Sequence, residues 1–221
     1  MTIAGNPGQW IDLLDSLVPD IVNLVLDGWG LMGSIPPDSK EDPVSEELCK
    51  MLRSARSLSE LPLQVHTQFV ELDSQSQGVN QGRIDIVFAL LVPDESVYFA
   101  LECKRVRVTH TDGSVRPYYS EYVTQGLFRF VSGQYSSEVR HGGMIAFVLD
   151  GNVTTAMRGI VRNIKAKSAP LGLTAAGVEA SQYVPTNPSV HQTTHQRTVA
   201  AGEVVVQHFF MSSIRSFPNA E

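Results

Sequence analysis

Three charged residues, Asp85, Glu102 and Lys104, lie inside two consecutive apolar stretches of this chain. The stretches read GRIDIVFALL and VYFALECKRV, which is typical of buried β-strands. Side chains two apart on a strand project from the same face, so Glu102 and Lys104 point together while Cys103 points away. Because burying a carboxylate without a partner is costly, the pattern indicates a compensating group, and a metal ion is one such partner.

The intervening Pro-Asp-Glu-Ser segment predicts a tight turn, so the two stretches form a hairpin. A symmetric hairpin places Asp85 roughly opposite Lys104 and diagonal to Glu102, within reach on one face. Hard cations such as Mg2+ bind one or two carboxylates together with water and substrate phosphate. A lysine beside the metal would hold an attacking water, or help to deprotonate it, and would stabilise charge on a phosphate.

Other interpretations of these residues are open. Glu102 and Lys104 would form a solvent-facing pair if their strand lay at a sheet edge, although their apolar neighbours disfavour this. Asp85 and Glu102 would act as a metal-free acid–base pair, as in glycosidases, but Lys104 then has no role. A literal Pro-Asp occurs at Pro93-Asp94, where a turn would hold the carboxylate far from Glu102.

The pattern resembles the PD-(D/E)XK nuclease superfamily, which has the restriction-endonuclease-like fold. Its motif is an Asp on one strand, then Glu or Asp, any residue and Lys on the next, which Asp85, Glu102 and Lys104 match. The resemblance covers roughly residues 39–150. It implies a Mg2+-dependent endonuclease or deoxyribonuclease in which Mn2+ substitutes, with Asp85 and Glu102 as metal ligands and Lys104 positioning the nucleophilic water.

Members of this superfamily often carry a further Glu on the preceding helix. In this chain a helix is expected over 39–58, and Glu41 near its start looks like that residue, as a third metal ligand. Glu41 projects from the same helix face as the apolar stripe. Glu47 is the alternative, and Glu46 points further away.

The segment after the motif is basic. Residues 104–167 contain ten Lys or Arg and four Asp or Glu, although the whole chain has a net charge of −6. Such a segment either contacts a nucleic-acid backbone without reading its sequence or forms a solvated helix face. DNA is the expected partner and RNA is a second option. Candidate nucleic-acid contacts are Gln125 and Arg129 on the following helix, and His195 and Arg197 on a C-terminal hairpin, where a histidine is more often structural or exposed.

Periodicity supplies the elements that must position these residues. The expected order is helix, three strands, helix, strand, helix and a C-terminal hairpin, preceded by apolar helical segments that Pro19 divides. This order predicts an α/β chain with a central mixed sheet flanked by helices. A single nuclease-like domain is expected over 1–221, with a helical extension over 1–35, a core over 39–167 and mostly loop over 168–192 before the hairpin that ends the 168–221 segment.

Composition sets further limits. With 43% hydrophobic and 18% charged residues the chain is typical of a globular protein, and it has no membrane-length apolar run or signal-peptide pattern. Cys49 and Cys103 are expected as reduced thiols in a cytoplasmic protein. No zinc-ligand spacing or Gly-rich phosphate loop occurs, which excludes a Cys/His zinc site and an NTPase motor.

The expected function is hydrolysis of DNA phosphodiester bonds by a metal-dependent nuclease. The alternative is a catalytically silent protein of the same fold that binds nucleic acid or protein within a larger complex. A homodimer or a partner protein is compatible with either function.

Overall fold

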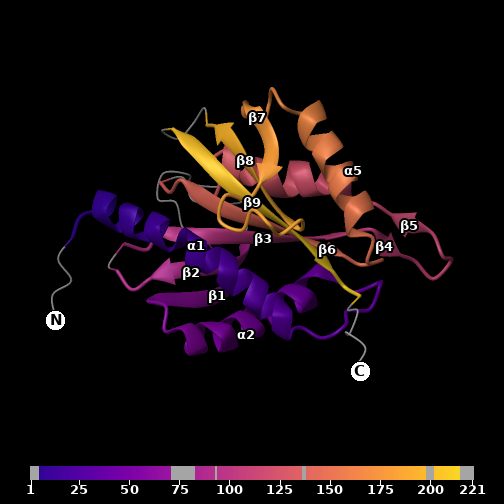
Figure 1. Ribbon diagram of the computed structural model, residues 1–221, viewed down its shortest axis with the longest axis horizontal. Coiled ribbons are helices and arrows are strands. Elements are labelled where there is room, and N and C mark those ends of the chain that lie inside the picture. Colours follow the sequence, from indigo (N-terminus) through magenta and orange to yellow (C-terminus); the bar gives the residue numbers. More distant parts are fainter. Residues whose placement is uncertain (1–4, 71–82, 93, 136–137, 198–201, 215–221) are drawn as a thin grey trace.

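The computed structural model describes residues 5–70, 83–92, 94–135, 138–197 and 202–214. They form a seven-stranded mixed sheet with helices on both faces (Figure 1), which confirms the expected fold class. None of the helices in these ranges has the length and apolarity required to cross a membrane.

The first helix, α1 (Pro7–Leu31), begins at a capping box in which Asn6 and Gln9 each accept a hydrogen bond from the other's backbone N–H, both at 3.1 Å. The expected division of this segment at Pro19 does not occur, because α1 continues through the proline. Val18 and Ile21 on either side are fully buried. Their packing outweighs the helical hydrogen bond that a proline cannot donate.

The second helix, α2 (Glu41–Ser59), falls where the sequence predicted it. Its N-cap is Lys40 rather than Ser39, and no side chain caps the first turn. The helix ends where Glu60 adopts a left-handed conformation, with φ of 53°. The α2 N-terminus therefore leaves its first side chain, Glu41, available for tertiary contacts.

The sheet has the strand order β1-β2-β3-β6-β9-β8-β7. Strands β3, β6 and β9 are mutually parallel neighbours, and all other neighbouring pairs are antiparallel. The strands are β1 (Leu63–Val70), β2 (Arg83–Leu90), β3 (Tyr98–Val106), β6 (His141–Val148), β7 (Leu173–Ala180), β8 (Val190–Gln196) and β9 (Glu203–Ser212).

The C-terminal hairpin is confirmed as β8 and β9, which pair antiparallel. The expectation of mostly loop over 168–192 is wrong, because β7 and the start of β8 lie there. The β7 sequence LTAAGVEA is rich in small residues and has no buried face, so periodicity gives no strand signal. Its pairing with β8 at the sheet edge makes it a strand.

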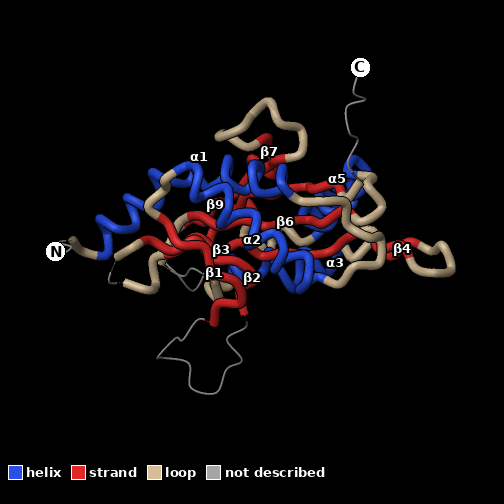
Figure 2. Tube along the Cα trace, turned by 90° about the horizontal axis from the view of Figure 1, so that it is seen from below, coloured by secondary structure: helices blue, strands red, loops and turns tan. Residues whose placement is uncertain are grey.

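Short elements follow β3. A two-stranded arm, β4 (Val108–Thr109) and β5 (Val115–Arg116), extends from one end of the molecule (Figures 1 and 2). The helix expected to carry Gln125 and Arg129 is divided into three consecutive pieces. They are α3 (Tyr119–Glu121), the π-helix η1 (Tyr122–Leu127) and α4 (Phe128–Val131). The last helix is α5 (Val153–Ala166), capped by Asn152.

Alternation along β3 separates two hydrophobic cores. Phe99 and Leu101 belong to the core that α1 and α2 cover. Tyr98 and Ala100 belong to the core on the opposite face, which η1, α4 and α5 cover. The two groups of helices lie on opposite sides of the sheet in Figure 1. The charged residues at the end of β3 therefore lie between two packed layers.

Candidate functional site

The candidate site forms where β2 and β3 separate. Their pairing covers Ile86–Ala89 with Tyr98–Leu101, and β3 then continues to Val106 paired with β6. The register differs by two residues from the symmetric hairpin expected. Ile86 pairs with Leu101, which sets Asp85 level with Glu102 rather than with Lys104.

The register differs because the connection between the last paired residues, Ala89 and Tyr98, is centred one residue before the Asp94–Glu95 step. Asp94 is a turn residue, as predicted, and its Oδ1 accepts hydrogen bonds from the backbone N–H and the hydroxyl of Ser96 at 3.0 and 2.6 Å. Asp94 therefore serves the turn, whereas Asp85 forms a hydrogen bond to β3.

Two carboxylates replace the missing strand partner of β3. Asp85 Oδ2 accepts a hydrogen bond from the Cys103 N–H at 2.8 Å, and Glu41 Oε2 accepts one from the Arg105 N–H at 3.0 Å. Alternate backbone N–H groups on a strand point the same way, so both carboxylates lie along one edge of β3. Buried N–H groups need acceptors, which explains why the separation of the strands is stable.

Lys104 joins the acidic residues. Its Nζ lies 2.8 Å from Glu102 Oε1, 2.8 Å from Glu41 Oε1 and 2.8 Å from the Cys103 carbonyl oxygen. The Lys104 side chain is 12% exposed and that of Glu102 only 1%. The prediction that Glu102 and Lys104 project together is confirmed. Glu41 is the helix carboxylate in the cluster, whereas Glu47 pairs with Lys50 on an exposed face of α2.

Arg129 also reaches Glu102, with Nη1 2.9 Å from Oε1. The same Nη1 contacts the Tyr135 hydroxyl, which donates to the Arg83 carbonyl at 2.9 Å. We call this group of side chains the acidic–basic cluster. It consists of Asp85, Glu102, Lys104, Glu41 and Arg129, together with Tyr135, which contacts Arg129.

Sequence reasoning proposed Arg129 as a nucleic-acid contact and missed Tyr135. Tyr135 lies past the end of α4, where helical periodicity no longer applies. Gln125, four residues before Arg129, is exposed within η1.

The cluster perturbs its own ionisation. Burial, with Glu102 nearby, raises the pKa of Asp85 to about 7. Burial also raises the pKa of Glu102, against the opposing effect of Lys104 and Arg129. Although burial alone would lower it, Glu102 and Glu41 raise the pKa of Lys104 well above its ordinary value. Lys104 therefore stays charged and acts as a hydrogen-bond donor rather than a base.

The donor chemistry of the cluster fits Mg2+. One or two carboxylates, with water and phosphate, are the usual ligands of this ion. Glu102 Oε2 is buried and has no hydrogen-bond partner among the described residues, so it is able to accept a cation. Within the same ranges no group of three or more His, Cys, Asp and Glu is arranged to hold an ion alone. Water and substrate oxygens would therefore complete the coordination.

His195 and Arg197 do not join the cluster. Both are buried, with exposed fractions of 0% and 8%, and each bonds a backbone carbonyl. His195 Nδ1 lies 2.8 Å from the Leu171 oxygen, and Arg197 Nη2 donates to the Val139 oxygen at 2.8 Å. A surface contact with nucleic acid is inconsistent with these positions, because the apolar pattern of β8 and β9 packs this face inward.

His195 belongs to a buried hydrogen-bonded chain whose direction the acceptors determine. Leu171 offers a carbonyl, so His195 Nδ1 carries the proton and Nε2 accepts from the Thr193 hydroxyl at 2.6 Å. Thr193 Oγ1 then accepts from His208 Nε2 at 2.8 Å, and His208 Nδ1 accepts from the Tyr122 hydroxyl at 2.9 Å. Both imidazoles are neutral, because burial lowers the pKa of His195 to about 4 and that of His208 to about 3.

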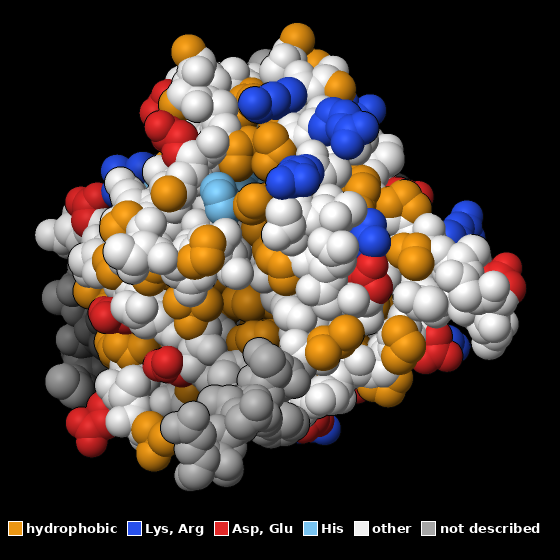
Figure 3. Space-filling view, turned by 45° about the vertical axis from the view of Figure 1, so that its right-hand side comes forward, with side chains coloured by type: hydrophobic (Ala, Val, Ile, Leu, Met, Phe, Trp, Pro, Cys, Tyr) orange, Lys and Arg blue, Asp and Glu red, His pale blue; other side chains and the backbone are white. Residues whose placement is uncertain are grey.

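Basic side chains lie exposed on α5. Arg158, Arg162 and Lys165 follow one face of this helix, which contains no acidic residue. Figure 3 shows Lys and Arg side chains gathered on the upper part of the face that it presents, where α5 lies in Figure 1. Part of the positive charge expected after the motif thus lies on the exposed face of α5.

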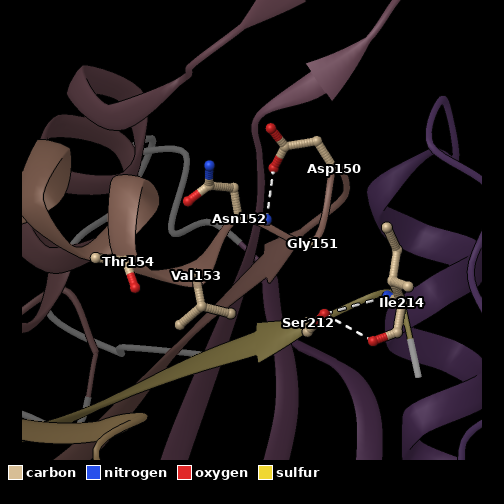
Figure 4. Close-up of a pocket in the computed structure, with 7 residues that line it drawn as sticks. All are labelled: Asp150, Gly151, Asn152, Val153, Thr154, Ser212 and Ile214. Carbon is tan, nitrogen blue, oxygen red and sulfur yellow. Dashed lines mark hydrogen bonds between the residues drawn. The ribbon is translucent and has the colours of Figure 1, made fainter. Parts of the chain in front are cut away.

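A cavity of about 620 Å³ lies at the ends of β6 and β9, beside the start of α5 (Figure 4). Its polar groups bond one another: Asp150 Oδ1 accepts from the Asn152 N–H at 3.0 Å, and the Ser212 hydroxyl donates to the Ile214 oxygen at 2.8 Å. Asp150 also accepts from Arg107 at 2.7 Å. The cavity contains no residue of the acidic–basic cluster, which is therefore the stronger candidate for chemistry.

Comparison of the chain with protein-family models, with curated proteins and with solved structures finds no significant match.

Proposed function

We propose that this protein is a metal-dependent nuclease that hydrolyses DNA phosphodiester bonds. The observation that carries the proposal is the acidic–basic cluster at the separation of β2 and β3. It combines two buried carboxylates, one of them with an oxygen that no described residue bonds, with a charged lysine at 2.8 Å. Buried ionisable groups held together at such cost are characteristic of functional sites.

In the proposed site, Asp85 and Glu102 hold Mg2+, or Mn2+ in its place, and Glu41 assists directly or through water. The bound ion would polarise the phosphate and stabilise charge in the transition state. The Asp85 carboxylate is already fixed by the Cys103 N–H, so its free oxygen has a defined position. Arg129 binds the same Glu102 oxygen as Lys104 and helps to orient this carboxylate.

Lys104 is proposed to hold the attacking water by donating a hydrogen bond. Its three donor hydrogens face Glu102, Glu41 and the Cys103 carbonyl. Water binding therefore requires one of these contacts to be exchanged, and the most exposed partner, Glu41 at 25%, is the one that would be released. An ammonium in this place also stabilises negative charge on the phosphate.

The basic face of α5 is proposed to contact the DNA backbone. Arg158, Arg162 and Lys165 would bind phosphates without reading bases. The chain as a whole has a net charge of −6, so affinity is expected to be modest and strongly dependent on salt.

A second candidate is a catalytically silent binding subunit of a larger complex. It is favoured by the same contacts of Lys104, since an ammonium that already satisfies Glu102 and Glu41 also works as a structural ion pair. Calorimetric titration with Mn2+ separates the two candidates. The nuclease requires binding that Asp85→Asn abolishes, and the silent subunit requires none.

Plasmid cleavage tests the proposal directly. The wild-type protein is expected to cut in Mg2+ and to be inactive in EDTA, and Asp85→Asn and Lys104→Ala are expected to be inactive although folded by circular dichroism. Lys50→Ala, which removes an exposed lysine paired with Glu47, is the control and should cut normally. Cleavage in EDTA, or an active folded Lys104→Ala protein, would contradict the mechanism.

A further inference from the structure

Two arginines beside the cluster share one aromatic ring. The guanidinium carbon of Arg105 lies 5.5 Å from the centre of the Tyr118 ring, and that of Arg116 lies 5.3 Å from it. Arg105 follows Lys104 on β3, and Arg116 lies on β5 in the projecting arm. Residues eleven apart in sequence are thus gathered at one end of β3.

These two arginines differ from others of the chain in their partners. Arg83, Arg107 and Arg140 each pair with a carboxylate. In the part of the chain that the structure describes, neither Arg105 nor Arg116 has a carboxylate within ion-pair distance. The only side-chain hydrogen bond of Arg105 to these residues is to the Ser39 carbonyl, at a long 3.3 Å. Two positive charges therefore share one ring without a described counterion.

The backbone is shaped to bring these groups together. Tyr118 has φ of 52°, and Arg107 at the other side of the arm has φ of 54°, both in the left-handed region that non-glycine residues rarely occupy. Arg107 N–H donates to the Pro117 carbonyl at 3.2 Å, and Thr109 N–H donates to the Pro37 carbonyl at 3.1 Å. These backbone hydrogen bonds hold the base of the arm, next to the left-handed residue Tyr118 whose ring contacts both arginines.

A guanidinium that lies over a ring uses its face and keeps its N–H edge available. That edge matches two oxygens of a phosphate, and arginine is the residue best suited to such paired hydrogen bonds. Arg116 is exposed and Arg105 partly exposed, so an anion from solvent is able to reach them.

We propose that Arg105, Tyr118 and Arg116 form a binding site for the phosphates of a nucleic-acid backbone, next to the cluster. The proposal rests on the nuclease function proposed above and deepens it, because it assigns residues that hold the DNA strand beside Lys104. These residues bind and position the substrate and take no part in the chemical step.

Binding of a short fluorescein-labelled DNA duplex of mixed sequence, followed by anisotropy in EDTA over a series of salt concentrations, tests the site. Each lost phosphate contact lowers the slope of log affinity against log salt by about 0.9. In the Arg105→Ala/Arg116→Ala double variant, the magnitude of this slope is therefore expected to be smaller than in the wild type by up to about 1.8. Lys50→Ala removes one positive charge on α2 and is the matched control, with an unchanged slope.

Tyr118→Leu removes the aromatic ring and so separates its contribution to binding from that of the two charges. It keeps both arginines, so it is expected to weaken binding while the salt slope stays within about 0.5 of the wild type. Circular dichroism of each variant establishes that it is folded. A folded double variant that binds with the wild-type affinity and slope would overturn the proposal. So would wild-type binding to anionic phospholipid vesicles, lost in the double variant, in the absence of any binding to DNA.

The outcomes distinguish this site from the nuclease proposal. If Lys104→Ala abolishes cleavage while the arginine variants bind normally, the nuclease stands and the phosphate site is wrong. If the arginine variants lose DNA binding but no form of the protein cuts DNA, the phosphate site stands and the nuclease is wrong.

Discussion

Replacing Lys104 with methionine removes the ammonium that joins Glu102 to Glu41 and leaves a side chain of similar length. Glu102 is 1% exposed and, among the described residues, would keep Arg129 as its only charged partner. Removing one member of a buried ion pair typically costs about 3–5 kcal/mol. Because Arg129 remains 2.9 Å away, we expect the lower end, about 3 kcal/mol of the free energy of unfolding.

A double variant tests the ion pair between Lys104 and Glu102 directly. Lys104→Met combined with Glu102→Gln removes both charges, and replacing a whole buried pair is often neutral for stability. The double variant is therefore expected within about 1 kcal/mol of the wild type. Glu102→Gln alone leaves Lys104 with Glu41 and the Cys103 carbonyl, so its expected cost is about 1–3 kcal/mol. The three losses are strongly non-additive.

Urea unfolding in EDTA, followed by tryptophan fluorescence and circular dichroism, measures these losses. The loss in Lys104→Met should be larger at alkaline than at acidic pH, because burial raises the pKa of Glu102 and protonation relieves the unpaired charge. A single variant that loses less than about 1 kcal/mol, or a double variant that equals the sum of the singles, would refute the ion-pair interpretation.

Three further predictions concern the pH dependence of stability and the effect of Pro19 on α1. The pKa of Asp85 is about 7 in the fold, above its ordinary 3.8, so its contribution to stability is complete below about pH 4 and is lost as the pH rises through 7. In urea unfolding measured across this pH range in EDTA, Asp85→Asn should remove that loss. The pKa of His195 is about 4 in the fold, below its ordinary 6.5, so stability should fall as pH drops from 6.5 to 4, and the fall should be shallower in His195→Gln. Pro19→Ala should raise the melting temperature, with up to about 3 kcal/mol gained from the restored helical hydrogen bond, and an unchanged melting temperature would mean that α1 already compensates.

The sequence predicted the parts of the fold that depend on local pattern. The apolar runs around Asp85 and Glu102 are paired central strands, and the alternation that puts Glu102 and Lys104 together is confirmed. The helix that carries Glu41 also lies where its periodicity placed it. These features follow from residues close in sequence, where side-chain spacing determines direction.

Features that depend on distant partners could not be predicted in this way. The hairpin register depends on where the connection between Ala89 and Tyr98 is centred. The continuity of α1 through Pro19 depends on its packing. The π-helix η1, which precedes Arg129, has no periodic signature. The alternating pattern around His195 is the same whether its face packs inward or meets solvent. The pairing of β8 with β9 places this face inside the fold.

The separation of β2 and β3 leaves a short length of strand edge inside the sheet, and the carboxylates of Asp85 and Glu41 close it. Open strand edges attract strands from other molecules and promote self-association. The acidic residues thus protect the fold as well as serving the candidate site. Asp85→Ala/Glu41→Ala would free the N–H groups of Cys103 and Arg105, and the double variant should form oligomers at concentrations where the wild type does not.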